Sequence, residues 1–361
     1  MKILFILKHR ENPYNSGSSD NYSYSSSLLS SGLYNSANFV CEMLNDSGVE
    51  AIMEHAIDNN CIDRLVTKHK PTHVIIEAYW VVPYKFEVLT KLHPTVQWIV
   101  RNHSELPFLS SEGIAIDWTC RYVDYPNVNV SGNSPRVLSE MKTIIKESHP
   151  EWSHEEAESR VWFLPNFYKA TWESRTQLEE TDTINIGCFG AIRPLKNQLL
   201  QAVSAIQFAD NIGKKLNFHI NATRIEGGAT SATLTNIRSL FDHVKANGHQ
   251  LIEHGWLNHD AFINLLKNQI DIGLCVSHSE TFCIVAADLV TAGVPLVTSK
   301  EVVWASGFSQ ANPNSSKEIT HKMSVAWWLR KTGIIETLNL WGLGRYCNKT
   351  RKQWLHYFGE N

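Results

Sequence analysis

Several polar side chains that could take part in catalysis or binding follow one apolar run in the second half of the chain. The run 272–276 predicts a buried strand, and Ser277 and Glu280 come directly after it. A helix is predicted to begin near Thr281, and the first N–H groups of a helix form a ready anion site. Asp288 lies eight residues after Glu280, on roughly the same face of that helix. The stretch therefore predicts an anion site beside carboxylates placed for catalysis or sugar binding.

A second block of the sequence combines a glycine turn with two cations. In residues 186–197 a predicted strand is followed by Gly190, Arg193 and Lys196 and then by a helix. Gly190 lets the backbone approach a ligand closely, while Arg193 offers a planar fork and Lys196 a point charge. This arrangement suits a diphosphate.

The strands and helices that position these two blocks are predicted from the pattern of apolar residues. Short apolar runs alternate with helical patterns along the whole chain. That alternation is typical of parallel α/β units. In the first half we predict strands at 3–7, 49–54, 73–77, 96–100 and 128–130, with helices at 33–45, 62–68, 86–92 and 135–145. In the second half we predict strands at 184–189, 216–220, 251–253, 272–276 and 296–298, with helices at 198–210, 234–246, 259–267, 282–292 and 327–354. This pattern predicts two doubly wound domains of similar size, with the boundary at residues 164–167 and in the polar stretch 173–183.

Length, composition and charge favour a globular protein of two domains and argue against a membrane-spanning or secreted one. The chain has 361 residues, which favours two domains, and 43 % apolar with 19 % charged residues indicates a globular protein. Its net charge is −3, from 33 basic and 36 acidic residues, so there is no global basic field for nucleic acid. No apolar run reaches the roughly 18 residues that a membrane span needs, and residues 1–7 are too short for a secretory signal.

Cysteine and histidine spacing bears on compartment and metals. The seven cysteines form no Cys-x-x-Cys pair, and their odd number suits a reducing compartment without a disulfide framework. The sequence has no His-Glu-x-x-His and no Asp-x-Asp motif, so we expect no metal cofactor. We expect a cytoplasmic protein.

The stretch 277–295 resembles the retaining glycosyltransferases of family four, which have the GT-B fold. The family signature is Ser-x-x-Glu-Gly-Phe-Gly, a second Glu eight positions after the first, and then Gly-x-Pro. The matching residues are Ser277, Glu280, Phe282, Gly293 and Pro295, while Thr281 and Cys283 replace the glycines and Asp288 replaces the second Glu. The resemblance implies that Glu280 contacts the donor sugar, that the amides of Thr281, Phe282 and Cys283 hold the diphosphate, and that Asp288 binds the ribose diol.

Weaker matches follow in the same order along the chain. The block with Gly190, Arg193, Lys196 and Asn197 resembles the family's Gly-Arg-x-x-x-x-Lys-Gly loop, with an Arg–Lys spacing of three instead of five. His103 stands just after a strand, where the family has a histidine at the donor sugar, and Gly255 and Trp256 end a strand where the family's backbone meets the base. On the acceptor side the candidates are His9, Arg10, Ser31, Gly32 and Asn102. The sequences Arg-Pro-Leu-Lys-Asn (193–197) and Ser-Glu-Thr-Phe (279–282) also resemble those of a subgroup of this family that is common in bacteriophages.

The resemblance implies two Rossmann-like domains that face each other across a cleft. Residues 1–168 would form an acceptor-side domain, 169–325 a nucleotide-sugar domain, and 326–361 a helical segment that crosses back to the first domain. The implied reaction moves a sugar with retention from a nucleoside-diphosphate sugar, such as a UDP- or GDP-sugar, to a hydroxyl acceptor. Glu280 and His103 would be the catalytic pair, and both would touch one sugar when the cleft closes.

Two other functions stay open. The acceptor could be a hydroxymethylated base in DNA, because the segment 317–352 interleaves tryptophans with eight basic residues and two acidic ones. A different class of protein, a sugar-nucleotide epimerase or a non-catalytic glycan-binding protein, could share the same fold. Transfer, isomerisation or binding without turnover would distinguish these functions.

Overall fold

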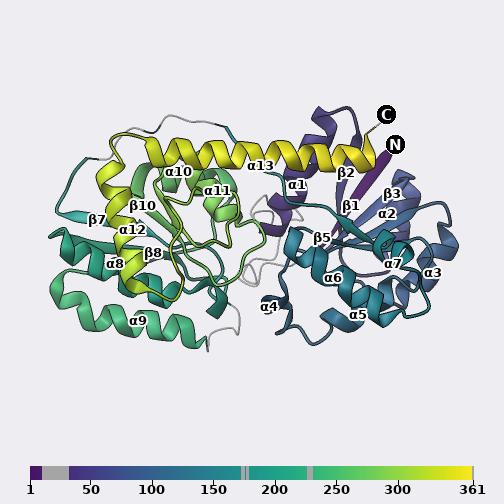
Figure 1. Cartoon of the computed structure of the whole chain (residues 1–361), viewed down its shortest axis with the longest axis horizontal. Helices are drawn as coiled ribbons and strands as arrows, with labels where there is room; N and C mark the ends of the chain where they lie inside the picture. Colours follow the sequence, from purple (N-terminus) through teal and green to yellow (C-terminus); the bar gives the residue numbers. More distant parts are fainter. Residues whose placement is uncertain (10–31, 172–174, 176–178, 226–230, 360–361) are drawn as a thin grey trace, which may run out of the picture. The chain divides into compact units, whose positions relative to one another are not determined.

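The computed structural model describes residues 1–9, 32–171, 175, 179–225 and 231–359 (Figure 1). The chain divides into two compact units, one formed by Met1–Lys169 with Cys347–Asn361 and the other by Ala170–Tyr346. The sequence analysis predicted a separate C-terminal segment that begins at residue 326. In the structure residues 326–346 belong to the second unit, and only the residues from Cys347 onward belong to the first.

The first unit is built on a parallel sheet of six strands in the order β2-β1-β3-β4-β5-β6. Its strands are β1 (Lys2–Lys8), β2 (Glu50–Ala56), β3 (His73–Glu77), β4 (Gln97–Arg101), β5 (Val128–Gly132) and β6 (Val161–Phe163). Its helices are α1 (Gly32–Asp46), α2 (Cys61–His69), α3 (Lys85–Leu92), α4 (Leu106–Leu109), α5 (Ala115–Tyr122), α6 (Pro135–Ser148) and α7 (His154–Ser159). The sequence prediction missed β6, α4, α5 and α7.

Alternation along the strands gives this sheet two buried faces. In β1, Leu4 and Ile6 pack in one hydrophobic cluster with α2, α3 and α6. Ile3, Phe5 and Leu7 pack in the other cluster, with α1 and the end of the last helix. Because successive side chains of a strand point to opposite faces, an uninterrupted apolar run is what a doubly covered sheet requires.

The second unit has a parallel sheet of five strands in the order β11-β10-β7-β8-β9. Its strands are β7 (Thr183–Gly187), β8 (Lys215–Asn221), β9 (Gln250–His254), β10 (Ile272–Cys275) and β11 (Leu296–Thr298). Its helices are α8 (Gln198–Asn211), α9 (Ala232–Val244), α10 (His259–Gln269), α11 (Ile284–Thr291) and α12 (Ser316–Leu329), together with the short 3₁₀ turns η2 (Pro194–Lys196) and η4 (Lys245–Asn247). The last helix, α13 (Ile334–Phe358), begins in this unit and ends in the first.

The strand order of the second unit reverses at one point. From β7 the chain builds outward through β8 and β9, and then β10 adds to the other side of β7. The loops that leave neighbouring strands in opposite directions open a crevice at such a switch point, where open α/β sheets bind ligands. The two blocks singled out in the sequence are the loops that follow β7 and β10.

The long helical pattern predicted at 327–354 is two helices instead of one. The break lies between α12 and α13, where Gly333 has a φ of +65°. Residues 330–333 form a turn, and the left-handed Gly333 directly before α13 interrupts the helical backbone, a conformation that glycine adopts at little cost. No helix in the described ranges is long and apolar enough to cross a membrane.

Candidate functional site

The centre of the candidate site is an ion pair between the loops that follow β7 and β10. Lys196 Nζ lies 2.5 Å from Glu280 Oε1, and Ser277 Oγ donates to the same oxygen over 2.7 Å. Burial disfavours the charge on Lys196, but the Glu280 carboxylate outweighs it, so the pKa of Lys196 is raised. The sequence predicted both residues separately, and the structure brings them together at the switch point.

Side-chain amides fix these two loops to each other. Asn197 Nδ2 donates to the carbonyl oxygens of Val276 (3.1 Å) and Pro313 (2.7 Å). Buried Gln201 donates to Lys196 O over 2.7 Å and accepts from Val276 N over 2.8 Å. Asn197, predicted as a donor ligand, therefore holds the loop after β10, and Gln201 is an anchor that the sequence reasoning missed.

The turn that leads into α11 corrects one sequence prediction. The helix begins at Ile284, three residues after the predicted start near Thr281. Cys283 precedes it in the left-handed conformation, with φ +63° and ψ +81°. Trp304 Nε1 holds the turn by donating to the carbonyl of buried Phe282 over 2.8 Å. The amides of the first helical turn therefore belong to Ile284 and the residues after it, and not to Thr281 and Phe282.

Asp288 lies on α11 and is almost completely buried. Its Oδ1 is 2.8 Å from Nε2 of His259, the first residue of α10. This hydrogen bond raises the pKa of His259, although burial opposes the shift. The helical arithmetic that placed Asp288 on the face of Glu280 does not hold, because the residues between Glu280 and Ile284 are not helical. His259 was not predicted from the sequence.

The remaining residues predicted to bind the donor lie after the carboxyl ends of β7 and β9. Gly190 has a φ of +107°, and a Cβ built there would meet Lys196 Cε at 4.0 Å. Its N–H donates to Asn221 Oδ1 over 2.9 Å. Arg193 immediately precedes the turn η2, which carries Lys196. Gly190, Arg193 and Lys196 therefore lie on one short loop, as the sequence predicted.

An aromatic residue marks the end of β9. Asn221 Nδ2 donates to Gly255 O over 3.4 Å. The guanidinium carbon of Arg224 lies 5.2 Å from the centre of the Trp256 ring, which is a cation–π geometry. Trp256 is partly exposed, so the residue is not part of the hydrophobic core.

The first unit has a buried charged network at the ends of β3 and β4. Arg101 Nη1 lies 3.1 Å from Glu77 Oε1, and both side chains are fully buried. Arg101 also donates to Leu164 O (3.1 Å), Pro165 O (3.2 Å) and Asn166 Oδ1 (2.8 Å). Burial would raise the pKa of Glu77, but Arg101 and His103 outweigh it and the pKa is lowered. The sequence reasoning missed this network.

His103 is part of the same network. Its Nε2 is hydrogen-bonded to Glu77 Oε2. Burial lowers the pKa of His103, although the Glu77 carboxylate acts in the other direction. A neutral imidazole that donates from Nε2 has its Nδ1 unprotonated, so Glu77 fixes the tautomer of His103.

The other acceptor-side candidates have varied surroundings. Asn102 forms a local turn, in which its side chain bonds to both the N–H (3.0 Å) and the C=O (2.7 Å) of Ser104. His9 follows β1 and donates its backbone N–H to Ala56 O over 2.7 Å. Gly32 is the first residue of α1. Arg10 and Ser31 lie outside the described residues.

The described part of the chain holds no group of three His, Cys, Asp or Glu side chains placed to bind a metal ion. Its cysteines are all free.

Comparison with known proteins gives the fold. No protein-family model and no curated protein matches the chain. OtsA, a trehalose-6-phosphate synthase, matches in its apo structure with a TM-score of 0.66 at 9 % identity, and the match covers 100 % of both chains. An E. coli trehalose-6-phosphate structure bound with UDP-2-fluoro glucose matches with a TM-score of 0.65 at 10 % identity, over 100 % of this chain and 99 % of that one.

A third match is an alpha-glucosyltransferase in complex with UDP and a 13-mer DNA containing an HMU base. Its TM-score is 0.59 at 12 % identity, over 100 % of this chain and 96 % of that one. The chain has the GT-B fold. This GT-B fold is the one that the sequence analysis expected from the residues 277–295.

Proposed function

We propose that this GT-B protein is a retaining glycosyltransferase that moves a sugar from a nucleoside-diphosphate sugar to a hydroxyl acceptor. The observation that carries the proposal is the Lys196–Glu280 pair at the switch point of the second unit. It joins a cation suited to a diphosphate to a carboxylate suited to sugar hydroxyls. The matched structures with bound UDP or UDP-2-fluoro glucose support a nucleotide sugar as the co-substrate.

The proposed roles follow from charge. Lys196 and Arg193 would stabilise the negative charge that develops on the diphosphate as the glycosidic bond breaks, because donors fixed in advance need no reorganisation. Both hydrogen bonds described for Glu280 end on Oε1, so Oε2 would accept a hydroxyl of the donor sugar. Asp288 would bind the ribose diol, with its carboxylate held by His259.

We also propose the finer family assignment, glycosyltransferase family four and its bacteriophage subgroup, on the matches at Ser277, Glu280, Phe282, Gly293 and Pro295. The conformation of Cys283 supports it, because the family has a glycine at this position and the backbone here is left-handed. Since free cysteines suit a reducing compartment, we propose the cytoplasm as the site of action.

The test is incubation with a panel of UDP- and GDP-sugars, followed by separation of the products. A glycosyltransferase releases nucleoside diphosphate and free sugar by slow hydrolysis of its preferred donor, whereas an epimerase returns an isomerised donor. We expect Glu280→Gln to fold, to bind the nucleoside diphosphate and to lose most of the donor hydrolysis. Asp242→Asn is the matched control, because it removes one exposed carboxylate on α9, and it should react like the parent protein.

His103 belongs to the same proposal through its expected role at the donor sugar. His103→Ala should lower the rate of transfer per folded molecule, in addition to any loss of melting temperature from removing a hydrogen bond to the buried Glu77. An early melt with an unchanged rate per folded molecule would assign His103 to the stability of the Glu77–Arg101 network instead. Absence of both hydrolysis and isomerisation with every donor would contradict the enzymatic function.

A hydroxymethylated DNA base is the second acceptor to test. The match to an alpha-glucosyltransferase bound to DNA with an HMU base favours it. In the segment 317–352, Trp328 and Trp341 are 74 % and 62 % exposed, and Arg345 lies over the Trp341 ring at 4.7 Å. Exposed aromatic and basic side chains suit base stacking and phosphate contact. Incubation with the preferred donor should increase the mass of duplex DNA that contains hydroxymethyluracil by one sugar. Such an increase, with no mass increase on unmodified DNA and no transfer to a glycan array, would establish this acceptor.

A further inference from the structure

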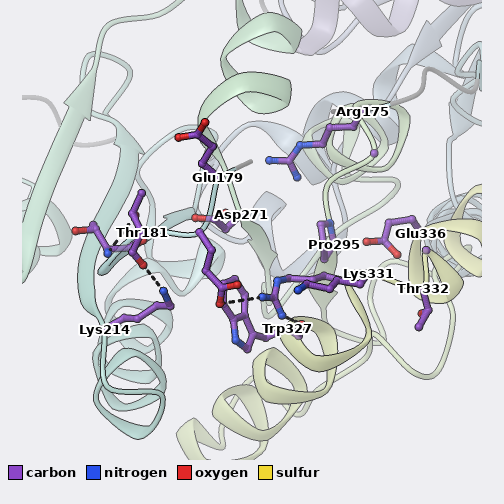
Figure 2. A pocket seen from close by; sticks show the side chains of 15 residues that line it. Arg175, Glu179, Thr181, Lys214, Asp271, Pro295, Trp327, Lys331, Thr332 and Glu336 are labelled. Carbon is purple, nitrogen blue, oxygen red and sulfur yellow. Dashed lines mark hydrogen bonds and ion pairs between the residues drawn. The ribbon is translucent and has the colours of Figure 1, made fainter. Parts of the chain in front are cut away.

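The second unit has a cavity of about 480 Å³ at the edge of its sheet where the strands begin. Its lining includes Thr183 at the start of β7, Lys214 before β8, Asp271 before β10 and Pro295 before β11 (Figure 2). Lys196 and Glu280 follow the other ends of these strands. The cavity is therefore separate from the candidate active site, and the inference below does not depend on the proposed function.

The lining of this cavity carries charges of both signs, with four carboxylates and four cations. The helices α8, α10, α11 and α12 all end here, and the last carbonyl groups of a helix carry a partial negative charge. The protein's own cations already bond to backbone carbonyls at this edge. Arg175 donates to Lys267 O (2.9 Å), and Arg330 donates to Trp327 O (2.6 Å).

One buried carboxylate at the cavity has an unmet hydrogen-bonding capacity. Glu336, in the first turn of α13, is 5 % exposed, and its Oε2 has no hydrogen-bond partner among the residues that the structure describes. Arg175 lines the same cavity, and its charge opposes the effect of burial on the pKa of Glu336, but its hydrogen bonds among the described residues go to the carbonyl oxygens of Lys267 and Ile270. Burial raises the pKa of Glu336, and it raises the pKa of Asp271 as well. A buried acceptor without a partner destabilises the folded protein, so a ligand that supplies a donor there is favoured.

We propose that this cavity binds a small organic cation whose ammonium group donates a hydrogen bond to Glu336 Oε2. An ammonium supplies both the missing donor and the positive charge that the buried carboxylates and the helix ends favour. A neutral hydroxyl supplies only the donor. The volume is far larger than a single monatomic ion fills, so it leaves room for an organic molecule.

The test compares two probes of the same length, 1,4-diaminobutane and 1,4-butanediol, by isothermal titration calorimetry. We expect the diamine to bind the parent protein at one saturable site and the diol not to bind. Glu336→Gln should weaken diamine binding at least 10-fold. Asp242→Asn also removes one negative charge, on the exposed surface of α9, and it should bind like the parent protein.

A second measurement uses only the parent protein, in case Glu336→Gln does not fold. A bound ammonium favours the ionised form of Glu336, so the affinity of the parent protein for the diamine should fall as the pH is lowered and Glu336 becomes protonated, measured in sodium phosphate and acetate buffers that contain no organic cation. The proposal is overturned if the diamine fails to saturate the parent protein, if the diol binds as tightly, or if Glu336→Gln binds the diamine unchanged. A diamine affinity that does not fall as the pH is lowered would also overturn it.

Discussion

Replacement of Lys196 by methionine is the sharpest test of the candidate donor site. The substitution keeps an unbranched side chain of similar length and removes the ammonium that pairs with Glu280 at 2.5 Å. A hydrogen bond to a charged group contributes about 1.5–3 kcal/mol. At about 1.4 kcal/mol per factor of ten, we expect the dissociation constant of UDP or GDP to rise about 10- to 150-fold.

A double variant separates two causes of this loss. In Lys196→Met the mostly buried Glu280 has lost its cationic partner, and its carboxylate would repel an incoming diphosphate. Adding Glu280→Gln removes that repulsion. We therefore expect the double variant to bind the nucleotide more tightly than the single variant, and the full double-mutant cycle to show a coupling energy of about 0.5–3 kcal/mol. The melting temperature should follow the same order, because the single variant leaves a buried charge without its partner.

Calorimetry with UDP and GDP measures these constants, with Lys245→Met as the control that removes an exposed lysine of the same unit. Nucleotide affinity in Lys196→Met equal to that of the parent protein would show that Lys196 is not a diphosphate ligand. If the double variant binds no better than the single one, Glu280 does not face the diphosphate, and the proposed shared site is wrong.

Two further predictions concern the turn before α11 and the buried pair behind it. At Cys283 we expect Gly to be more stable than Ala by about 1 kcal/mol in urea unfolding, because a left-handed L-residue costs roughly 1–2 kcal/mol and glycine does not pay it; equal stability, or a more stable Ala variant, would contradict the strain. For His259, the raised folded-state pKa means that its pairing with Asp288 stabilises the protein fully below the unfolded value of about 6.5 and progressively less as the pH rises through the folded value. The stability gap between the parent protein and Asp288→Asn should therefore be larger at pH 6 than at pH 9, and a gap independent of pH would refute this coupling.

The strands were predictable because their signal is local. The apolar runs at 3–7, 73–77 and 296–298 lie within or coincide with β1, β3 and β11, since strands covered on both faces need continuous apolar residues. The start of α11 was not predictable in the same way. Left-handed residues are usually glycine, so nothing in the type of Cys283 indicates the turn. The prediction that Asp288 shares a helix face with Glu280 was wrong for the same reason, because the helix begins only at Ile284.

The Glu77–Arg101 pair had a usable signal that the sequence reasoning did not apply. The runs 73–77 and 97–101 are both apolar and end in opposite charges. In the sheet β3 and β4 are parallel neighbours, and their register places Glu77 directly beside Arg101. Opposite charges at the same end of neighbouring strands predict a buried ion pair once the strand order is known. Strand order is a tertiary property, so that order had to come from the structure.

The candidate donor site is preformed, and the residues that preform it are uncharged. Asn197 and Gln201 satisfy backbone groups of the loops after β7 and β10, and Asn221 holds Gly190. Loops that are already fixed lose little conformational entropy when a ligand binds. An amide also adds no net charge, so these three residues leave the sign of the potential at the switch point to ionised groups such as Arg193, Lys196 and Glu280. Neutral amides therefore hold the loops in place, and the ionised side chains are left to bind the ligand.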